Sequence, residues 1–149
     1  MGTDIHLFIE TKIADRWHAI TPPAEASYVA YAEQNPPLFA IEQPSEASHL
    51  LRWHLRPRYT FFNVLAAVRG AGADPRGWPD DPSAELAAIL RFEGGDAHSM
   101  SWETAETFIS KAAIADVLLR AWWDGPDWGP HLVALARTNP TRCLFYFDN

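Results

Sequence analysis

The chain opens with a regular alternation of apolar and polar positions. Over residues 4–11 the apolar positions recur at every second residue, at Ile5, Leu7 and Ile9. A period of two is typical of a β-strand with one buried face. Ala14 and Asp15 then form a predicted tight turn, and residues 16–20 are expected to return as an antiparallel strand. The other face of the first strand carries Asp4, His6, Phe8 and Glu10.

A further strand is expected at the end of the chain. In residues 142–148 one face carries Cys143, Phe145 and Phe147. Between the two ends the apolar spacing becomes helical, which predicts helices over residues 60–69, 82–90, 102–123 and 130–137. Strands at both ends with helices between them predict an α+β fold: an antiparallel sheet in which the N- and C-terminal strands are adjacent, packed by about four helices.

Capping residues define where the first three helices should begin and end. Thr60, Asp81 and Ser101 are the expected N-caps, because a short polar side chain can accept a hydrogen bond from the first helical turn. Arg69 is expected in the last turn of the first helix, where a cation complements the helix dipole. Gly70 and Gly72 would then terminate that helix.

A proline-rich excursion interrupts this pattern over residues 21–56. Its prolines lack a backbone N–H and break regular elements; they are Pro22, Pro23, Pro36, Pro37 and Pro44. Short helices are expected between them, over residues 25–33 and 45–53. A chain of 149 residues is most simply one domain, so the excursion is expected to pack on that domain or to form a lid.

The net charge and the cysteine content exclude several classes of function. A net charge of -7 argues against a broad nucleic-acid surface, which needs clustered Lys and Arg. It is compatible with a bound cation, or with a small anion held by a few local donors. No apolar run approaches transmembrane length, and Asp4 and His6 interrupt any signal peptide, so a cytoplasmic protein without a membrane partner is expected. The single cysteine, Cys143, excludes an intramolecular disulfide and is expected to be a buried, inert thiol.

Two Asp-x-His pairs are the main chemical signal. Asp4 and His6 share a strand face, and Asp96 and His98 repeat the spacing after two glycines. A solvated strand face explains an isolated pair without any function. If the fold joins the two pairs, their oxygen and nitrogen atoms suit a divalent metal such as Zn, Mn or Mg, which would activate water for hydrolysis. Without a metal, His6 or His98 would be a general base oriented by its aspartate. Ser99 follows His98 but lacks a nucleophile elbow of the Gly-x-Ser-x-Gly type.

A binding module is the competing interpretation. Tyr59, Trp78 and Trp102 could stack on a base or ring, and Arg58 and Arg69 could donate to phosphate. The structural alternative is strong for Tyr59 and Trp102, because both adjoin predicted helices and would then belong to the core. Neither glycine-containing segment fits a Walker-type phosphate loop or a dinucleotide fingerprint.

Five parts of the chain also carry a family resemblance. In chain order they are MGTDIHLFIE, then Arg58-Tyr59 with Phe62, Leu65 and Val68-Arg69, then GWPDD with Ser83, then DAHSMSW, and finally FYFDN. Together they resemble a family of small uncharacterised phage and bacterial proteins that begin MGxDIHxxxE, carry a DxHSxSW segment and end in FWFDN. Thr3 stands where that family most often has Cys, which argues against a role for a thiol there. The resemblance implies a phage setting and a single site that contains Asp4, His6, Arg69, Asp96, His98, Ser99 and Asp148.

These observations lead to three functional hypotheses. The first is a metal-dependent hydrolase of a small phosphorylated, nucleotide-like substrate, with Arg69 holding the anionic group. The second is a non-catalytic binder that sequesters a nucleotide signal of host defence. The third is a protein-interaction inhibitor of a host enzyme, which needs neither metal nor pocket. Ligand contacts are expected from Tyr59, Arg69, Ser99, Trp102 and Asp148.

Overall fold

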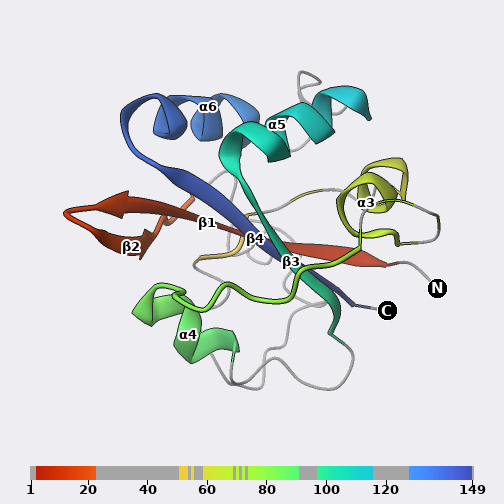
Figure 1. The fold of residues 1–149 in the computed structure, drawn as a ribbon, viewed down its shortest axis with the longest axis horizontal. Coiled ribbons are helices and arrows are strands. Elements are labelled where there is room, and N and C mark those ends of the chain that lie inside the picture. The colour runs from red at the N-terminus through yellow and green to blue at the C-terminus, as the bar shows by residue number, and fades with distance from the viewer. Residues whose placement is uncertain are drawn as a thin grey trace, which may run out of the picture.

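An antiparallel sheet of four strands, in the order β2-β1-β4-β3, forms the centre of the structure (Figure 1). Its strands are β1 (Asp4–Ile13), β2 (Arg16–Ala19), β3 (His98–Thr104) and β4 (Thr141–Asp148). The two terminal strands are neighbours along their whole length, with Asp4 opposite Asp148 at one end and Thr11 opposite Thr141 at the other. The predicted α+β fold with adjacent first and last strands is therefore confirmed.

The computed structural model describes residues 3–22, 51–53, 55, 59–68, 70, 72, 74–90, 97–115 and 128–148. The helix expected over residues 25–33, most of the one expected over 45–53, and the predicted site residues Arg58, Arg69 and Asp96 lie outside these ranges. Within them, no helix is both long enough and apolar enough to cross a membrane.

The β1–β2 hairpin forms as the sequence predicts. Ala14 and Asp15 have positive φ angles of 50° and 62°, the left-handed conformation at both central positions that a two-residue hairpin with native twist requires. The first strand continues to Ile13, two residues beyond the predicted end, because Ile13 still pairs with Arg16 across the hairpin.

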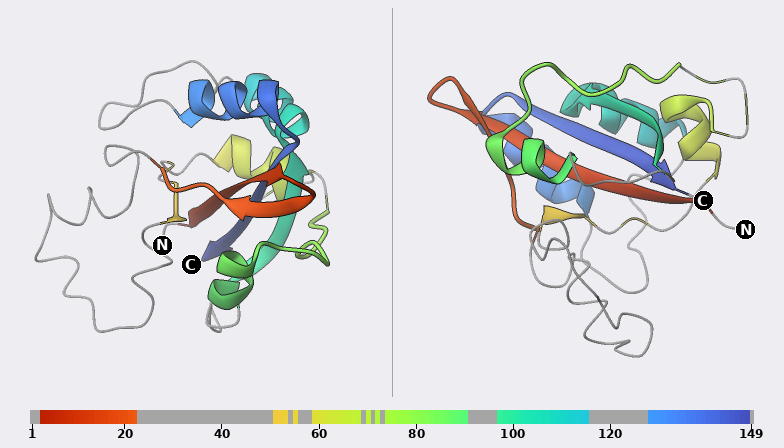
Figure 2. Two further views of the ribbon diagram at one scale, coloured as in Figure 1. Left: turned by 90° about the vertical axis from the view of Figure 1, so that its left-hand side faces the viewer. Right: turned by 90° about the horizontal axis from the view of Figure 1, so that it is seen from below.

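Helices cover both faces of the sheet. Three of them, α3 (Tyr59–Ala66), α5 (Ala105–Ile114) and α6 (Trp128–Thr138), lie on one face, and α4 (Ala84–Leu90) lies on the other. Figure 2 shows the sheet between these two layers. The first layer covers the apolar positions that the alternation predicts, Ile5, Leu7, Ile9, Cys143, Phe145 and Phe147. Burial raises the pKa of the Cys143 thiol well above its usual value, which agrees with the expected inert cysteine.

The opposite face of the sheet is also buried, so the solvated strand face considered for β1 is wrong at Phe8 and Glu10. Phe8 is 1% exposed and Glu10 is 0% exposed. Helix α4 covers this face, where its Leu86 and Ile89 pack with Phe8 and with residues of β4. A second, smaller core therefore lies beneath α4.

Residues 98–104 differ most from the prediction, because they form the edge strand β3 where a loop and a helix start are expected. Trp102 pairs with Leu144 in β4, and the helix begins only at Ala105. Its N-cap is Thr104, whose hydroxyl accepts a hydrogen bond from the Thr107 amide at 3.3 Å, so the predicted N-cap Ser101 is wrong. The period-two signal is weak here because both faces of β3 are partly covered.

The boundaries of α3 also shift. Its first residue is Tyr59, which places the predicted N-cap Thr60 inside the helix. The last helical residue is Ala66, and Ala67 adopts a left-handed φ of 56° with its amide donating to the Asn63 carbonyl at 2.9 Å. This is a left-handed helix terminator, a position that glycine usually occupies.

Helix α4 has a different N-cap from the predicted one. The Ser83 hydroxyl accepts from the Leu86 amide at 3.3 Å. Asp81, the predicted cap, instead interacts with Arg142. Helix α6 starts two residues before Pro130, the residue at which it is expected to open.

Candidate functional site

His6, Tyr146 and Asp148 form a hydrogen-bonded group at the end of the sheet where the chain starts, here called the histidine cluster. The His6 Nε2 atom lies 2.7 Å from Asp148 Oδ2, and Nδ1 lies 2.8 Å from the Tyr146 hydroxyl. The imidazole and phenol rings stack with 4.3 Å between centroids. With its hydrogen on Nε2, a neutral imidazole donates to the carboxylate and accepts from the phenol.

The electrostatics of the cluster keep the carboxylate charged. The hydrogen bond from His6 is the main cause that lowers the pKa of Asp148 below its usual value, and the positive charge of Arg52, together with that of His6 when the imidazole is protonated, adds to it. Partial burial acts in the opposite direction. An ionised carboxylate that fixes one imidazole nitrogen is the arrangement of a general base and its orienting acid. The carboxylate that hydrogen-bonds His6 in the structure is that of Asp148, and the orienting role expected of Asp4 stays a prediction.

His98 lies on the opposite face of the sheet from His6. It is the Cα partner of Phe147, whereas His6 is the partner of Tyr146. Successive residues of a strand point to opposite faces, and the His98 ring lies 6.1 Å from the ring of Phe147 between centroids. Its Nδ1 atom is 3.0 Å from the hydroxyl of Ser99. The structure therefore separates the two predicted histidines.

The described residues contain no group of three His, Cys, Asp or Glu side chains that could hold a metal ion. The predicted four-ligand site includes Asp96, which lies outside the described ranges, so metal binding stays a prediction. Of the other expected ligand contacts, Tyr59 accepts from the Thr3 amide at 3.2 Å with its hydroxyl. It lies on α3, on the other side of the sheet from α4.

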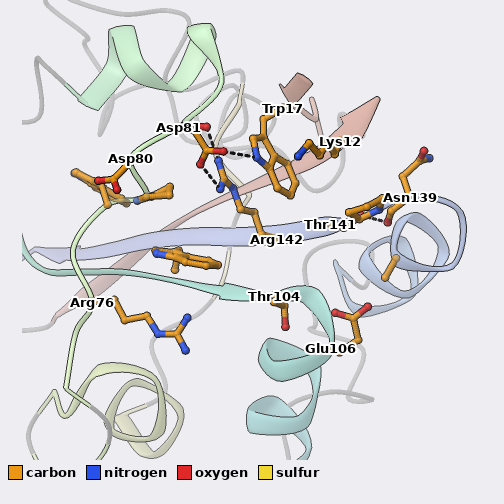
Figure 3. A pocket seen from close by; sticks show the side chains of 15 residues that line it. Lys12, Trp17, Arg76, Asp80, Asp81, Thr104, Glu106, Asn139, Thr141 and Arg142 are labelled. Carbon is orange, nitrogen blue, oxygen red and sulfur yellow. Dashed lines mark hydrogen bonds and ion pairs between the residues drawn. The ribbon is translucent and has the colours of Figure 1, made fainter. Parts of the chain in front are cut away.

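A large cleft opens elsewhere, over the end of the sheet where β4 begins (Figure 3). Its volume is about 1150 Å³. We call it the tryptophan cleft, and the residues that define it are Lys12, Trp17, Arg76, Trp78, Trp102 and Arg142. All four strands, or the segments next to them, contribute to its walls. The sequence predicts Trp78 and Trp102 as stacking residues, and both line this cleft.

Arg142 is fixed at the floor of the cleft. Its side chain is 4% exposed, its Nε donates to Glu10 Oε2 at 2.7 Å, and one terminal nitrogen donates to Asp81 Oδ1 at 2.9 Å. The other terminal nitrogen donates to the Asp81 carbonyl at 2.8 Å. The hydrogen bond from Arg142 is the main cause that lowers the pKa of Asp81. Since three of its five N–H donors are engaged by two carboxylates and a carbonyl, Arg142 links β4 to β1 and to Asp81 at the floor of the cleft.

Cations and indole rings alternate across the cleft in what we call the cation–indole row. The Lys12 ammonium lies 5.6 Å from the Trp17 ring, and the Arg142 guanidinium lies 3.9 Å from that ring and 5.8 Å from Trp102. The Arg76 guanidinium ends the row, 5.0 Å from Trp102. These distances are within the range of cation–π attraction. Figure 3 shows Lys12 and Arg76 on opposite sides of Arg142.

Trp78 lies outside this row. Its ring packs nearly perpendicular to the ring of Tyr146, with 5.9 Å between centroids, and no cation stacks on it within the described part of the chain. Trp17 donates its indole N–H to Asp81 at 3.1 Å. Among the described residues, the indole N–H groups of Trp78 and Trp102 have no hydrogen-bond acceptor. Within the described residues, the lining of the cleft thus contains an indole ring without a stacked cation and two indole N–H donors without an acceptor.

Sequence reasoning missed Trp17, Arg76 and Arg142 as residues of this cleft. One signal was present: Glu10 and Arg142 carry opposite charges and become Cα partners once the terminal strands pair in register. Opposite charges on facing strand positions predict an ion pair. Nothing in the sequence pattern placed Arg76 beside Trp102, because that contact depends on how residues 76–81 cross the sheet.

Neither the family models, nor the curated proteins, nor the solved structures contain a match to this chain.

Proposed function

We propose that this protein binds a small ligand with a planar ring, of the nucleotide type, in the tryptophan cleft. The observation that carries the proposal is the presence of three tryptophans in the lining of one cleft, of which Trp78 has no stacked cation within the described chain. Indole rings bind planar groups through offset stacking and through the area that they remove from water.

The size of the cleft supports a ligand of this class. Small-molecule sites usually enclose roughly 300–1,000 Å³, and the tryptophan cleft reaches about 1150 Å³. A nucleotide-sized molecule therefore fits with room for water. Single metal ions and small inorganic anions would leave most of the apolar lining unused.

The polar groups of the cleft complement a nucleotide. Its wall combines the indole N–H donors of Trp78 and Trp102 with the exposed carboxylate of Asp80. Donors suit the ring nitrogens and carbonyl oxygens of a base, and a carboxylate suits sugar hydroxyls or an exocyclic amine. We place the ring on Trp78, because arginines already lie against Trp17 and Trp102.

Binding without turnover is the form of the proposal that we favour. The imidazole of His6 contacts Tyr146, and Tyr146 in turn contacts Trp78 at the cleft wall, so the general base does not itself line the cleft. Together with the resemblance to phage proteins, this supports sequestration of a nucleotide signal of host defence.

Isothermal titration calorimetry with ribonucleoside monophosphates and their nucleosides tests this function. At least one of these ligands is expected to bind with 1:1 stoichiometry and to be recovered chemically unchanged. Trp78→Leu keeps an apolar side chain against Tyr146 but removes the ring, so it should weaken binding about tenfold or more. Tyr59→Leu, an equivalent change outside the cleft, should bind as the wild type does. Absence of binding by every ligand, or full binding by Trp78→Leu, would refute the proposal.

Hydrolysis at the histidine cluster is the second candidate function. The specific observation in its favour is the chain of contacts from Asp148 through His6 to Tyr146. In this candidate His6 is the general base, and Asp4 and Asp96 remain candidate ligands for a divalent metal. Turnover of phosphorylated nucleotides, measured with and without added Zn, Mn or Mg, should be lost in His6→Gln and retained in Trp78→Leu. If the wild type gives no turnover under any of these conditions, hydrolysis is refuted and binding without turnover is the remaining proposal.

A further inference from the structure

We infer that Arg76 forms an anion subsite at the Trp102 end of the tryptophan cleft, so that the bound ligand carries a phosphate group next to its ring. This inference rests on the proposed function and specifies the chemistry of the ligand. The three cations of the cleft differ in how strongly the protein already engages them, and that difference identifies Arg76.

Arg142 is excluded as the anion-binding residue. Its side chain is 4% exposed and its nitrogens donate to Glu10, to the Asp81 carboxylate and to the Asp81 carbonyl. Recruiting it to a ligand would leave the fully buried carboxylate of Glu10 without its cation, which is strongly unfavourable.

Arg76, in contrast, is half exposed and only loosely paired. Its side chain is 51% exposed, and its terminal nitrogen lies 3.5 Å from Glu103 Oε2. Glu103 has a second and closer cationic partner, because Lys111 of α5 forms a short ion pair with its other carboxylate oxygen. When Arg76 turns toward a ligand, Glu103 therefore keeps a compensating charge.

The position of Arg76 suits a phosphate that is attached to a stacked ring. Its backbone amide donates to the Ser101 hydroxyl at 3.0 Å, and the next amide, of Gly77, donates to the Met100 carbonyl at 2.8 Å. These two hydrogen bonds fix the backbone of residues 76 and 77 at the edge of β3, while the Arg76 guanidinium lies over Trp102. A planar guanidinium can remain stacked on an indole and still donate two parallel hydrogen bonds to phosphate oxygens.

Lys12 is the weaker alternative. It lies at the far end of the cation–indole row, on the other side of Arg142 from Arg76 (Figure 3). An ammonium group binds phosphate as a point charge and lacks the fork geometry of arginine. Trp78 is two residues after Arg76 on the same segment, which places the ring surface and the phosphate donor on one wall of the cleft.

The charged residues around the subsite give no net attraction for an anion, so a phosphate has to be recognised by direct contact. The acidic residues that line the cleft are Asp80, Asp81 and Glu106, equal in number to the basic residues Lys12, Arg76 and Arg142. Asp81 is paired with Arg142, and Asp80 and Glu106 are exposed, where water and salt screen them. The whole chain carries -7, so no long-range field attracts an anion. Phosphate affinity must come from direct contact with Arg76.

The test compares each ribonucleoside monophosphate with its own nucleoside by calorimetry. In the wild type we expect the phosphate to strengthen binding about 10- to 100-fold, the range for one charge-assisted contact of this kind. Arg76→Gln should abolish this preference and leave nucleoside affinity within about twofold. Arg137→Gln makes the same change in charge at an exposed position of α6 outside the cleft, and it should keep the full preference. Arg76→Lys should retain part of it.

Lys111→Met tests the inference a second time. If Arg76 had a purely structural role, this substitution would not change the ratio of nucleotide to nucleoside affinity. Lys111 does not line the cleft, but without it Arg76 becomes the only described cation on Glu103. The ratio of nucleotide to nucleoside affinity should then fall, with nucleoside affinity unchanged. The inference is overturned if Arg76→Gln keeps the wild-type ratio, if Lys111→Met leaves that ratio unaltered, or if the wild type binds nucleoside and nucleotide equally. If neither ligand class binds the wild type, the proposed function itself fails.

Discussion

Glu10 and Arg142 face each other across the two terminal strands and form a buried ion pair. They are Cα partners in the β1–β4 register, their side chains are 0% and 4% exposed, and the Oε2–Nε distance is 2.7 Å. The second Glu10 oxygen accepts from the Ser83 amide at 2.6 Å. One carboxylate therefore connects the first strand, the last strand and the N-cap residue of α4.

Arg142→Met should strongly destabilise the protein. The substitution preserves apolar volume but leaves the Glu10 carboxylate buried without its cation, which typically costs about 3–5 kcal/mol. Urea unfolding at neutral pH measures the change in the free energy of unfolding. Arg137→Met, at an exposed position, should change that free energy by less than about 0.5 kcal/mol.

The double variant separates the ion pair from its surroundings. Glu10→Gln removes the charge and keeps the hydrogen bond from Ser83, so Glu10→Gln with Arg142→Met should be more stable than Arg142→Met alone. A coupling free energy of at least about 1 kcal/mol is expected from the thermodynamic cycle. Additive effects of the two changes would show that the pair does not couple the strands.

The histidine cluster should make stability depend on pH in the acid range. Because the pKa of Asp148 is lower in the folded protein than its ordinary value of 3.8, its contribution is complete above that value and is lost as pH falls through the folded pKa. Asp148→Asn should therefore be less stable than the wild type near pH 5, and the difference should shrink as the pH falls from 3.8 through the lower folded pKa.

Solvent exposure of Asp148 limits the difference in stability between the wild type and Asp148→Asn. The Asp148 side chain is 37% exposed, so the difference near pH 5 should be no more than about 1 kcal/mol. Thermal unfolding at a series of pH values measures it. A difference between wild type and Asp148→Asn that stays constant down to the acid limit would contradict the assignment.

Ala67→Gly should stabilise the protein by about 1 kcal/mol. Ala67 has a φ of 56° at the end of α3, and a left-handed conformation costs an L-residue with a Cβ roughly 1–2 kcal/mol, part of which glycine loses again in chain entropy. Ala66→Gly is the control, since Ala66 is the last helical residue and is 2% exposed. It should destabilise by at least about 0.5 kcal/mol. Equal effects at the two neighbouring positions would rule out strain at Ala67.

Ala67 also illustrates what the sequence could and could not predict about the fold. Alternation defined β1 and the buried face of β4, and the Ala14-Asp15 turn defined the hairpin, because these signals are local. Helix α3 ends at a residue that has no special turn propensity, while the two glycines predicted to end it, Gly70 and Gly72, come later in the chain. Its end therefore has no local signal in the sequence.

The candidate site was predictable only in part, for a related reason. The sequence identified His6, Asp148, Trp78 and Trp102 as chemically notable, but not which of them come together. His6 finds its acid across the β1–β4 pair, and the strand pairing places His98 on the other face. Faces of a strand follow from register, and one residue of register decides whether two histidines can meet. Because a bulge lies between His98 and Ser101, the register of β3 against β4 cannot be derived from the residue spacing alone.

Tyr146→Phe should distinguish the histidine cluster from the tryptophan cleft. The substitution keeps the ring that meets Trp78 at 5.9 Å and removes the hydroxyl that lies 2.8 Å from His6 Nδ1. Ligand affinity in the cleft should therefore stay within about twofold of wild type, while the free energy of unfolding falls by about 0.5–1.5 kcal/mol through the lost hydrogen bond. Calorimetry and urea unfolding of the same preparation measure both quantities. If Tyr146→Phe instead weakens ligand binding as much as Trp78→Leu does, the phenol hydroxyl couples the two sites, and the histidine cluster belongs to the binding site after all.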